Sequence, residues 1–177
     1  MIDTIADIHN KKSPSEEMQD SIEPIIHKQE VILIGSDHRG YDLKVILRKH
    51  LTDLHYDVLD IGTHNNERCD YPDVAKSLVL NLPKANTNVK GILICGSGFG
   101  MSITANRHKG VHAVVPRTVK ECETARQHGN VNVLCIGTDF TSDVEAVRIV
   151  DTFLNTDYEE LDTSRYSQRI KMIDEDD

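Results

Sequence analysis

GILICGSGFGMSITANRH, residues 91–108, decides the fold of this chain. Its first five residues form a short apolar run typical of a buried parallel strand. Glycines at positions 96, 98 and 100 then predict a turn, and residues 101–108 have the pattern of a helix. A strand that passes through a glycine-rich turn into a helix is the building unit of an α/β protein.

The same alternation extends over most of the chain. Further strands are expected at residues 31–35, 57–62, 111–115 and 131–137, and helices at residues 40–54, 73–82, 118–128, 142–155 and 164–173. Short buried strands that alternate with amphipathic helices predict a doubly wound, Rossmann-like α/β domain. We expect one five-stranded parallel sheet with helices on both faces.

The length of 177 residues suits a single domain with a hydrophobic core. Residues 1–29 are polar and interrupted by prolines, which predicts an N-terminal extension. The α/β domain is expected to span residues 30–173. Residues 174–177, with the sequence DEDD, are expected to form an acidic, solvated tail.

Composition excludes several classes of function. The net charge of −9 argues against a nucleic-acid-binding surface. No apolar run approaches the roughly 18 residues that a membrane span needs, and the N-terminus has no signal-peptide pattern. The four cysteines show no C-x₂-C spacing, so we expect free thiols in the cytoplasm and no metal site.

Ligands of such folds bind beyond the carboxyl ends of the strands, where the strand order reverses. Asp37 and His38 follow the first expected strand, and residues 95–100 follow the third. His128 lies just before the fifth strand. We expect these three places to converge on one site.

Each candidate residue also has a purely structural interpretation. The glycine-rich turn can hold an anion, or it can simply be a tight turn. Cys95 can be a thiolate base or nucleophile, or a small buried side chain. Asp37 can bind sugar hydroxyls, move a proton or cap the following helix. His38 can contact a phosphate group.

The same holds for residues later in the chain. His128 ends a helix, where a histidine is often structural. Arg165 and Arg169 are four residues apart and share a helix face. They can bind a phosphate group together, or lie on a solvated face with acidic neighbours.

In their order, these segments resemble the type B ribose-5-phosphate isomerases, in the wider family that includes galactose-6-phosphate isomerase subunits. The resemblance covers residues 31–170. It is carried by IGSDHRGYDLK, DIGTH, DYPDVA, GILICGSGFGMSITANRHKGVHAVV, ARQHGNVNVLCIG and a late R-x-x-x-R. Some relatives carry a glutamate base at the position of Met101, and this chain is of the kind with a cysteine base.

The resemblance implies an aldose-ketose isomerase of the pentose phosphate pathway that needs no cofactor or metal. Cys95 matches the base that moves a proton between the first two sugar carbons, and His128 matches the residue that opens the ring, together with Asp37. The remaining matches are substrate-binding: the enediolate loop of Gly96, Ser97, Gly98, Phe99 and Gly100, the pocket wall Tyr71, and the phosphate-binding His38, Arg165 and Arg169. The family also implies a homodimer, or a dimer of such dimers, in which the partner supplies the two arginines.

Two positions depart from the family pattern. Gly129 stands directly after His128, where relatives usually have an asparagine that makes a polar contact. In this chain either Asn130 makes that contact with the substrate or the contact is lost. Asp139 stands where relatives often carry a basic residue. Two alternatives therefore stay open: an isomerase of a six-carbon sugar phosphate, such as galactose or allose 6-phosphate, and a non-catalytic sugar-phosphate-binding protein.

Overall fold

The computed structural model describes residues 30–83, 88–158 and 165–175. The expected extension at residues 1–29 lies outside the described residues. Within the described residues no helix is both long and apolar enough to cross a membrane.

Five parallel strands form one sheet in the order β2-β1-β3-β5-β4. They are β1 (Val31–Ser36), β2 (Asp57–Gly62), β3 (Val89–Cys95), β4 (Ala113–Val114) and β5 (Val133–Gly137). The central strands β1, β3 and β5 are buried almost throughout, because helices cover both of their faces. This confirms the predicted fold class.

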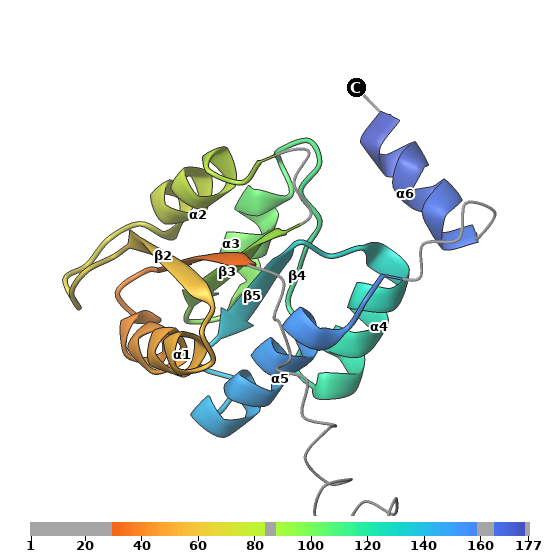
Figure 1. Ribbon diagram of the computed structural model, residues 1–177. Helices are drawn as coiled ribbons and strands as arrows, with labels where there is room; N and C mark the ends of the chain where they lie inside the picture. Colours follow the sequence, from red (N-terminus) through yellow and green to blue (C-terminus); the bar gives the residue numbers. More distant parts are fainter. Residues whose placement is uncertain (1–29, 84–87, 159–164, 176–177) are drawn as a thin grey trace, which may run out of the picture.

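The helices form two layers around the sheet (Figure 1). They are α1 (Tyr41–Asp53), α2 (Tyr71–Leu80), α3 (Phe99–Ala105), α4 (Val119–Gly129), α5 (Asp143–Asn155) and α6 (Arg165–Glu175). One hydrophobic cluster joins the sheet to α1, α4 and α5, and a second joins the other face to α2 and α3. Helix α6 lies outside these layers and contacts α4.

The first and last residues of several elements differ from the expected ones, because local interactions set where each element begins and ends. Helix α2 begins at Tyr71, because Pro72 fits the first turn of a helix rather than breaking it. Helix α3 begins at Phe99, directly after Gly98, whose backbone is left-handed. Strand β4 is shorter than expected, because only two of its residues pair with β5. Helix α6 reaches Glu175, so Asp174 and Glu175 are helical rather than part of a tail.

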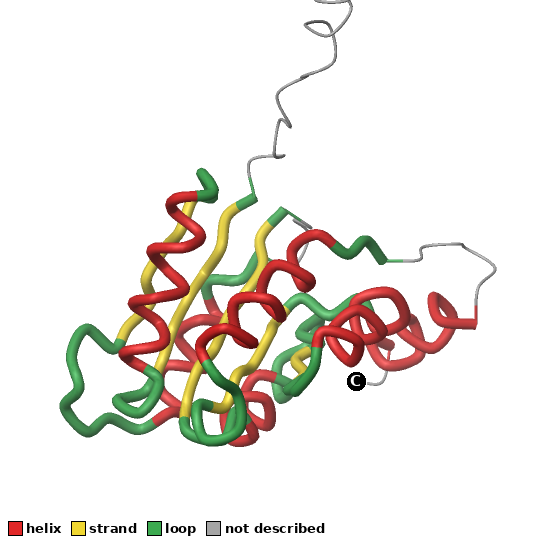
Figure 2. The backbone as a smooth tube through the Cα atoms, turned by 90° about the horizontal axis from the view of Figure 1, so that it is seen from below, coloured by secondary structure: helices red, strands yellow, loops and turns green. Residues whose placement is uncertain are grey.

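The strand order reverses between β1 and β3. The chain leaves β1 toward β2 on one side, and leaves β3 toward β4 and β5 on the other. The carboxyl ends of the strands gather at one edge of the sheet, at the bottom of Figure 2. This edge is where a doubly wound fold places its ligand.

Candidate active site

Three loops meet at the carboxyl edge of the sheet, after β1, β3 and β5. Cys95 at the end of β3 lies level with Gly137 in β5, and Ile94 lies level with Ser36 in β1. The amide of Asp37 donates to the Ile94 carbonyl at 3.1 Å, and the amide of Thr138 donates to the Cys95 carbonyl at 3.0 Å. The loop after β3 is therefore fixed from both sides.

The thiol of Cys95 lies inside the glycine-rich loop. Its Sγ accepts a hydrogen bond from the amide of Gly98 at 3.1 Å, and the residue is 4% exposed. Gly98 has φ 77°, a left-handed conformation that glycine adopts without strain. This turn directs its N–H back to the sulfur, where it stabilises negative charge.

The neighbours of Cys95 enclose the loop. A Cβ atom on Gly100 would lie 2.5 Å from the ring of Tyr71, so this ring packs directly on the start of α3. The Ser97 hydroxyl accepts from the Phe99 amide at 3.4 Å. The predicted loop residues and Tyr71 thus form one wall beside the thiol.

Asp37 and His38 are held by backbone contacts. Asp37 is buried, and its Oδ1 accepts from the amides of Arg39 at 2.9 Å and Gly40 at 3.1 Å. The carboxylate therefore stabilises the turn that leads into α1, but it does not cap the helix, because the N-cap residue is Gly40 and no side chain caps it. The Nδ1 of His38 lies 3.3 Å from the carbonyl oxygen of Cys69 and 3.4 Å from its amide nitrogen.

Two other buried thiols differ from Cys95 in their surroundings. Burial raises the pKa of the Cys122 thiol to about 12, although Arg126 acts in the opposite direction. Burial, and then the nearby Cys95, raise the pKa of Cys135. Both thiols therefore stay protonated near neutral pH and serve as core side chains.

His128 does not join the Cys95 loop within the same chain, so the expected convergence of all three places is wrong. Helix α4 carries the chain back from the carboxyl edge to the amino-terminal edge before β5 begins. Val133 is level with Gly91, four residues and about 13 Å along the sheet from Cys95. His128 precedes Val133 and lies at the opposite edge.

Other predicted residues share the edge of His128. The ring of Tyr166 on α6 stacks on the His128 ring, with centroids 4.0 Å apart. Arg165 and Arg169 are exposed on the same helix. Asn130 ends α4 in a left-handed conformation, which asparagine tolerates.

The predicted site is therefore divided between the two edges of the sheet. The carboxyl-edge set consists of Asp37, His38, Tyr71, Cys95, Gly96, Ser97, Gly98, Phe99 and Gly100. The amino-edge set consists of His128, Asn130, Arg165 and Arg169. One chain alone does not bring the two sets together.

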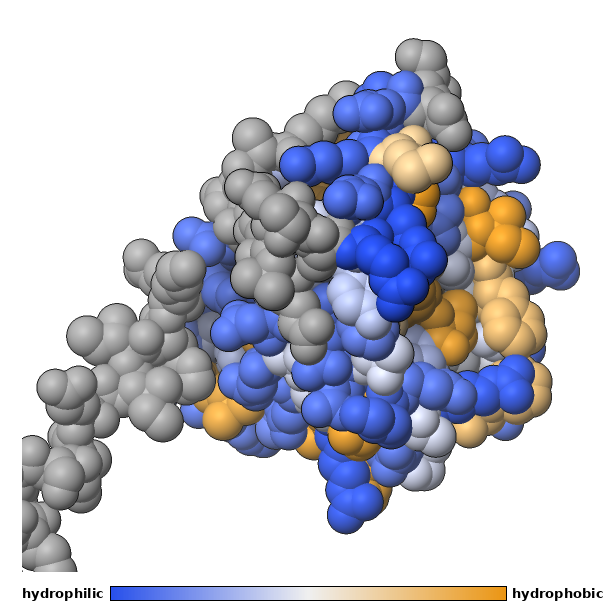
Figure 3. Space-filling view, turned by 90° about the vertical axis from the view of Figure 1, so that its right-hand side faces the viewer, coloured by the Kyte–Doolittle hydropathy of each residue, from blue (hydrophilic) through white to orange (hydrophobic). Residues whose placement is uncertain are grey.

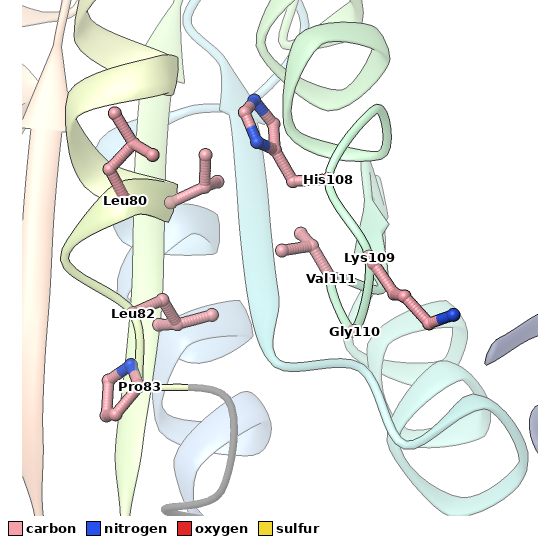
Figure 4. A pocket seen from close by; sticks show the side chains of 8 residues that line it. Leu80, Leu82, Pro83, His108, Lys109, Gly110 and Val111 are labelled. Carbon is pink, nitrogen blue, oxygen red and sulfur yellow. The ribbon is translucent and has the colours of Figure 1, made fainter. Parts of the chain in front are cut away.

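A pocket of about 250 Å³ also lies at the amino-terminal edge (Figure 4). It lies between the end of α2 and the segment before β4, and its lining includes Leu80, Leu82, His108 and Val111. No residue of either set lines it. This pocket is therefore separate from Cys95, which lies at the opposite edge of the sheet.

Sequence reasoning missed Arg39. Its guanidinium lies against Gly96 and donates to Asp139 at 2.5 Å. The signal was present in the sequence, because an unexplained aspartate beside a predicted anion site needs a nearby cation.

Comparisons with known proteins show the family of this chain. The model of the Ribose/Galactose Isomerase family matches residues 32–173. A probable ribose-5-phosphate isomerase B from Mycoplasma genitalium is 40% identical over 143 residues, covering 80% of this chain and 92% of that protein. Ribose-5-phosphate isomerase B from Escherichia coli K12 is 38% identical over 142 residues, covering 80% and 93%.

The fold agrees as well. The crystal structure of ribose-5-phosphate isomerase B from Mycoplasma genitalium with bound ribulose-5-phosphate matches with a TM-score of 0.77 and 39% identity, over 84% of this chain and 96% of that one. The matched region contains both edge sets, since it runs from β1 into α6. This chain belongs to the ribose/galactose isomerase family.

Proposed function

We propose that this protein interconverts ribose 5-phosphate and ribulose 5-phosphate. The proposal rests on the position of the Cys95 thiol. Its sulfur accepts a hydrogen bond from the Gly98 amide, at the point where the strand order reverses. The relatives named ribose-5-phosphate isomerase B support the five-carbon substrate, as does the neighbour solved with ribulose-5-phosphate.

The chemistry follows from this arrangement. Cys95 as thiolate removes the proton from C2 of the open-chain aldose, and the electron pair forms the C1–C2 double bond of an enediolate. The thiol then returns the proton to C1, while the hydroxyl proton passes from O2 to O1. Backbone amides of the 96–100 loop stabilise the negative charge on oxygen.

The division of the site supports a homodimer. We propose that the amino-edge set of one subunit meets the carboxyl-edge set of the other. His128 of one subunit would then open the sugar ring beside Asp37 of the other, and Arg165 and Arg169 would bind the phosphate group. The face seen from the side of α4 and α6 is mostly hydrophilic, with some hydrophobic residues between the polar ones (Figure 3).

A cytoplasmic location stays a prediction, and the thiols support it. All four cysteines are free, and Cys95, Cys122 and Cys135 are buried. A reducing compartment keeps a catalytic thiol in its active form. Fractionation of cells that express the full chain, with detection by antibody, would test the location.

The reaction is tested by measuring ribulose 5-phosphate formed from ribose 5-phosphate, with a chelator present. The wild type should turn over, and Cys95→Ala should lose about 10²–10⁴-fold in kcat while still binding substrate. Cys69→Ser is the matched control, because Cys69 contacts His38 through its backbone. Equal kcat for Cys95→Ala and wild type would contradict the proposal.

The same assay decides between the alternatives. Galactose 6-phosphate and allose 6-phosphate are offered beside ribose 5-phosphate at equal concentrations. A higher kcat/KM for a six-carbon substrate would replace the proposed substrate and keep the mechanism. Binding of sugar phosphates without turnover of any would identify a binding protein instead.

A further inference from the structure

Arg39 contacts all three loops at the carboxyl edge: it belongs to the first, packs on the second and forms an ion pair with the third. It leaves the loop after β1, its guanidinium packs on Gly96 after β3, and its Nη2 donates to Asp139 after β5. The space that a side chain at position 96 would occupy is filled by this guanidinium. A cationic group therefore covers the loop that holds Cys95.

Both ends of this ion pair are anchored to the sheet. The backbone amide of Arg39 donates to Asp37, and the amide of Asp139 donates to the Gly96 carbonyl at 2.9 Å. The Arg39 guanidinium is thus held over Gly96 by groups on either side of β3. Its side chain is nevertheless 53% exposed, and that of Asp139 is 39% exposed, so a ligand can approach.

The charges at this position need an explanation. An aspartate carboxylate beside a site for a phosphorylated sugar repels the substrate, and Arg39 neutralises it. A guanidinium carries five N–H donors in a planar fork. Asp139 takes one of these through Nη2, and the fork retains donors for a phosphate oxygen.

We propose that Arg39 binds the phosphate group of the sugar phosphate, and that Asp139 is a positioning residue that orients its guanidinium. This inference rests on the proposed function. Relatives often carry a basic residue at position 139, in the loop after β5, where this chain has an aspartate. Arg39 then supplies the missing cation from the loop after β1. His38, the neighbouring residue in the chain, contacts Cys69 in the loop after β2, whereas Arg39 lies over the loops after β3 and β5.

The test compares Arg39→Ala with Asp139→Asn in the full chain, measuring KM and kcat for ribose 5-phosphate and the inhibition constant of inorganic phosphate. Arg39→Ala should raise KM and the phosphate inhibition constant by about 10- to 100-fold, with kcat within about threefold of wild type. Asp139→Asn should leave KM within about threefold, because the amide Oδ1 still accepts from Nη2 and keeps the guanidinium over Gly96. Arg39→Lys should recover part of the loss, since it restores the charge without the fork.

A purely structural ion pair predicts a different pattern. Removing either partner would then have the same effect on KM, and both variants would lower the melting temperature equally. Unchanged KM in Arg39→Ala would also overturn the proposal. Arg48→Ala is the matched control, because Arg48 is 56% exposed and pairs with Asp60 of β2 rather than with a residue of either edge set.

A second variant tests the position of the charge directly. The double variant Arg39→Ala with Asp139→Arg places the cation at the other end of the pair. Its KM should return to within about threefold of wild type, because residue 139 is anchored beside Gly96. No recovery relative to Arg39→Ala would contradict the proposal. Absence of turnover in the wild type would instead refute the proposed function, and phosphate binding measured by calorimetry would still test Arg39.

Discussion

Gly98 shapes the surroundings of Cys95 at the level of single residues. Its left-handed backbone directs an amide to the sulfur, and a Cβ atom there would lie 2.7 Å from Val115. Gly129 offers a contrast within the same chain. It lies in the last turn of α4, where a Cβ atom would meet only Val131 at 3.5 Å.

Gly98→Ala should therefore lower the free energy of unfolding by about 2 kcal/mol, from backbone strain and the clash with Val115. It should also lower kcat, because the amide moves away from the thiol. Gly129→Ala should raise the free energy of unfolding by up to about 1 kcal/mol, because alanine favours a helix. Urea unfolding at constant m-value measures both, and equal changes in the two variants would refute this account of the loop.

The sequence correctly placed the carboxyl-edge set together. Asp37 and His38 follow β1 and Cys95 ends β3, and parallel strands bring such residues to one edge. Arg39 was missed, because the signal for it lies in its ion-pair partner, the aspartate at position 139. That partner is 100 residues away in the chain, and only the fold brings the two together.

At the level of elements, an ion pair with a buried lysine joins α1 to β2. Lys44 is 1% exposed, and its ammonium donates to Asp60 and to the Thr63 carbonyl, each at 2.5 Å. Burial raises the pKa of Asp60, but Lys44, the Gly62 amide and Arg48 lower it by more, so the net pKa is below 3.8. The ionised carboxylate is therefore the form that stabilises the fold.

A carboxyl group with a lowered pKa stabilises the protein above its ordinary pKa and loses this effect as the pH falls through the folded value. Asp60→Asn should lower the free energy of unfolding by about 3 kcal/mol at pH 7, because Lys44 loses its buried partner. The difference from wild type should shrink below about pH 4. Urea unfolding at several pH values measures this.

Asp53→Asn is the matched control for this prediction. Asp53 pairs with Lys49 within α1, and both side chains are largely exposed, at 61% and 75%. Its loss should change stability by less than about 0.5 kcal/mol at either pH. If Asp60→Asn behaved like Asp53→Asn, the buried pair would not contribute as described.

The pattern of elements was predictable, and their arrangement was less so. Hydrophobic periodicity located β2 at residues 57–62 as observed. It did not give the order of the strands, in which β5 lies between β3 and β4. Periodicity also placed His128 just before β5. A residue before a parallel strand lies at the amino-terminal edge of the sheet, whereas Cys95 lies at the carboxyl edge, so the prediction that the two converge within one chain was wrong.

At the level of the whole molecule, the division of the site is the central result. Cys95 and His128 lie at opposite edges of one sheet, and α4 fixes this separation because it runs antiparallel to the strands. If His128 opens the sugar ring, as proposed, two chains are needed to place it beside the thiol. The proposal therefore requires that the amino-edge set of one chain meets the carboxyl-edge set of another.

Mixing two inactive variants tests this claim most directly. Cys95→Ala and His128→Ala are each purified, unfolded, mixed in equal amounts, refolded together and assayed with ribose 5-phosphate. Half of the dimers are then mixed, and each carries one intact site of two, so activity should return to about 25% of wild type. Each variant refolded alone should stay inactive. Activity in the mixture no higher than in the separate variants, with mixed dimers verified by mass spectrometry, would contradict a site shared between chains.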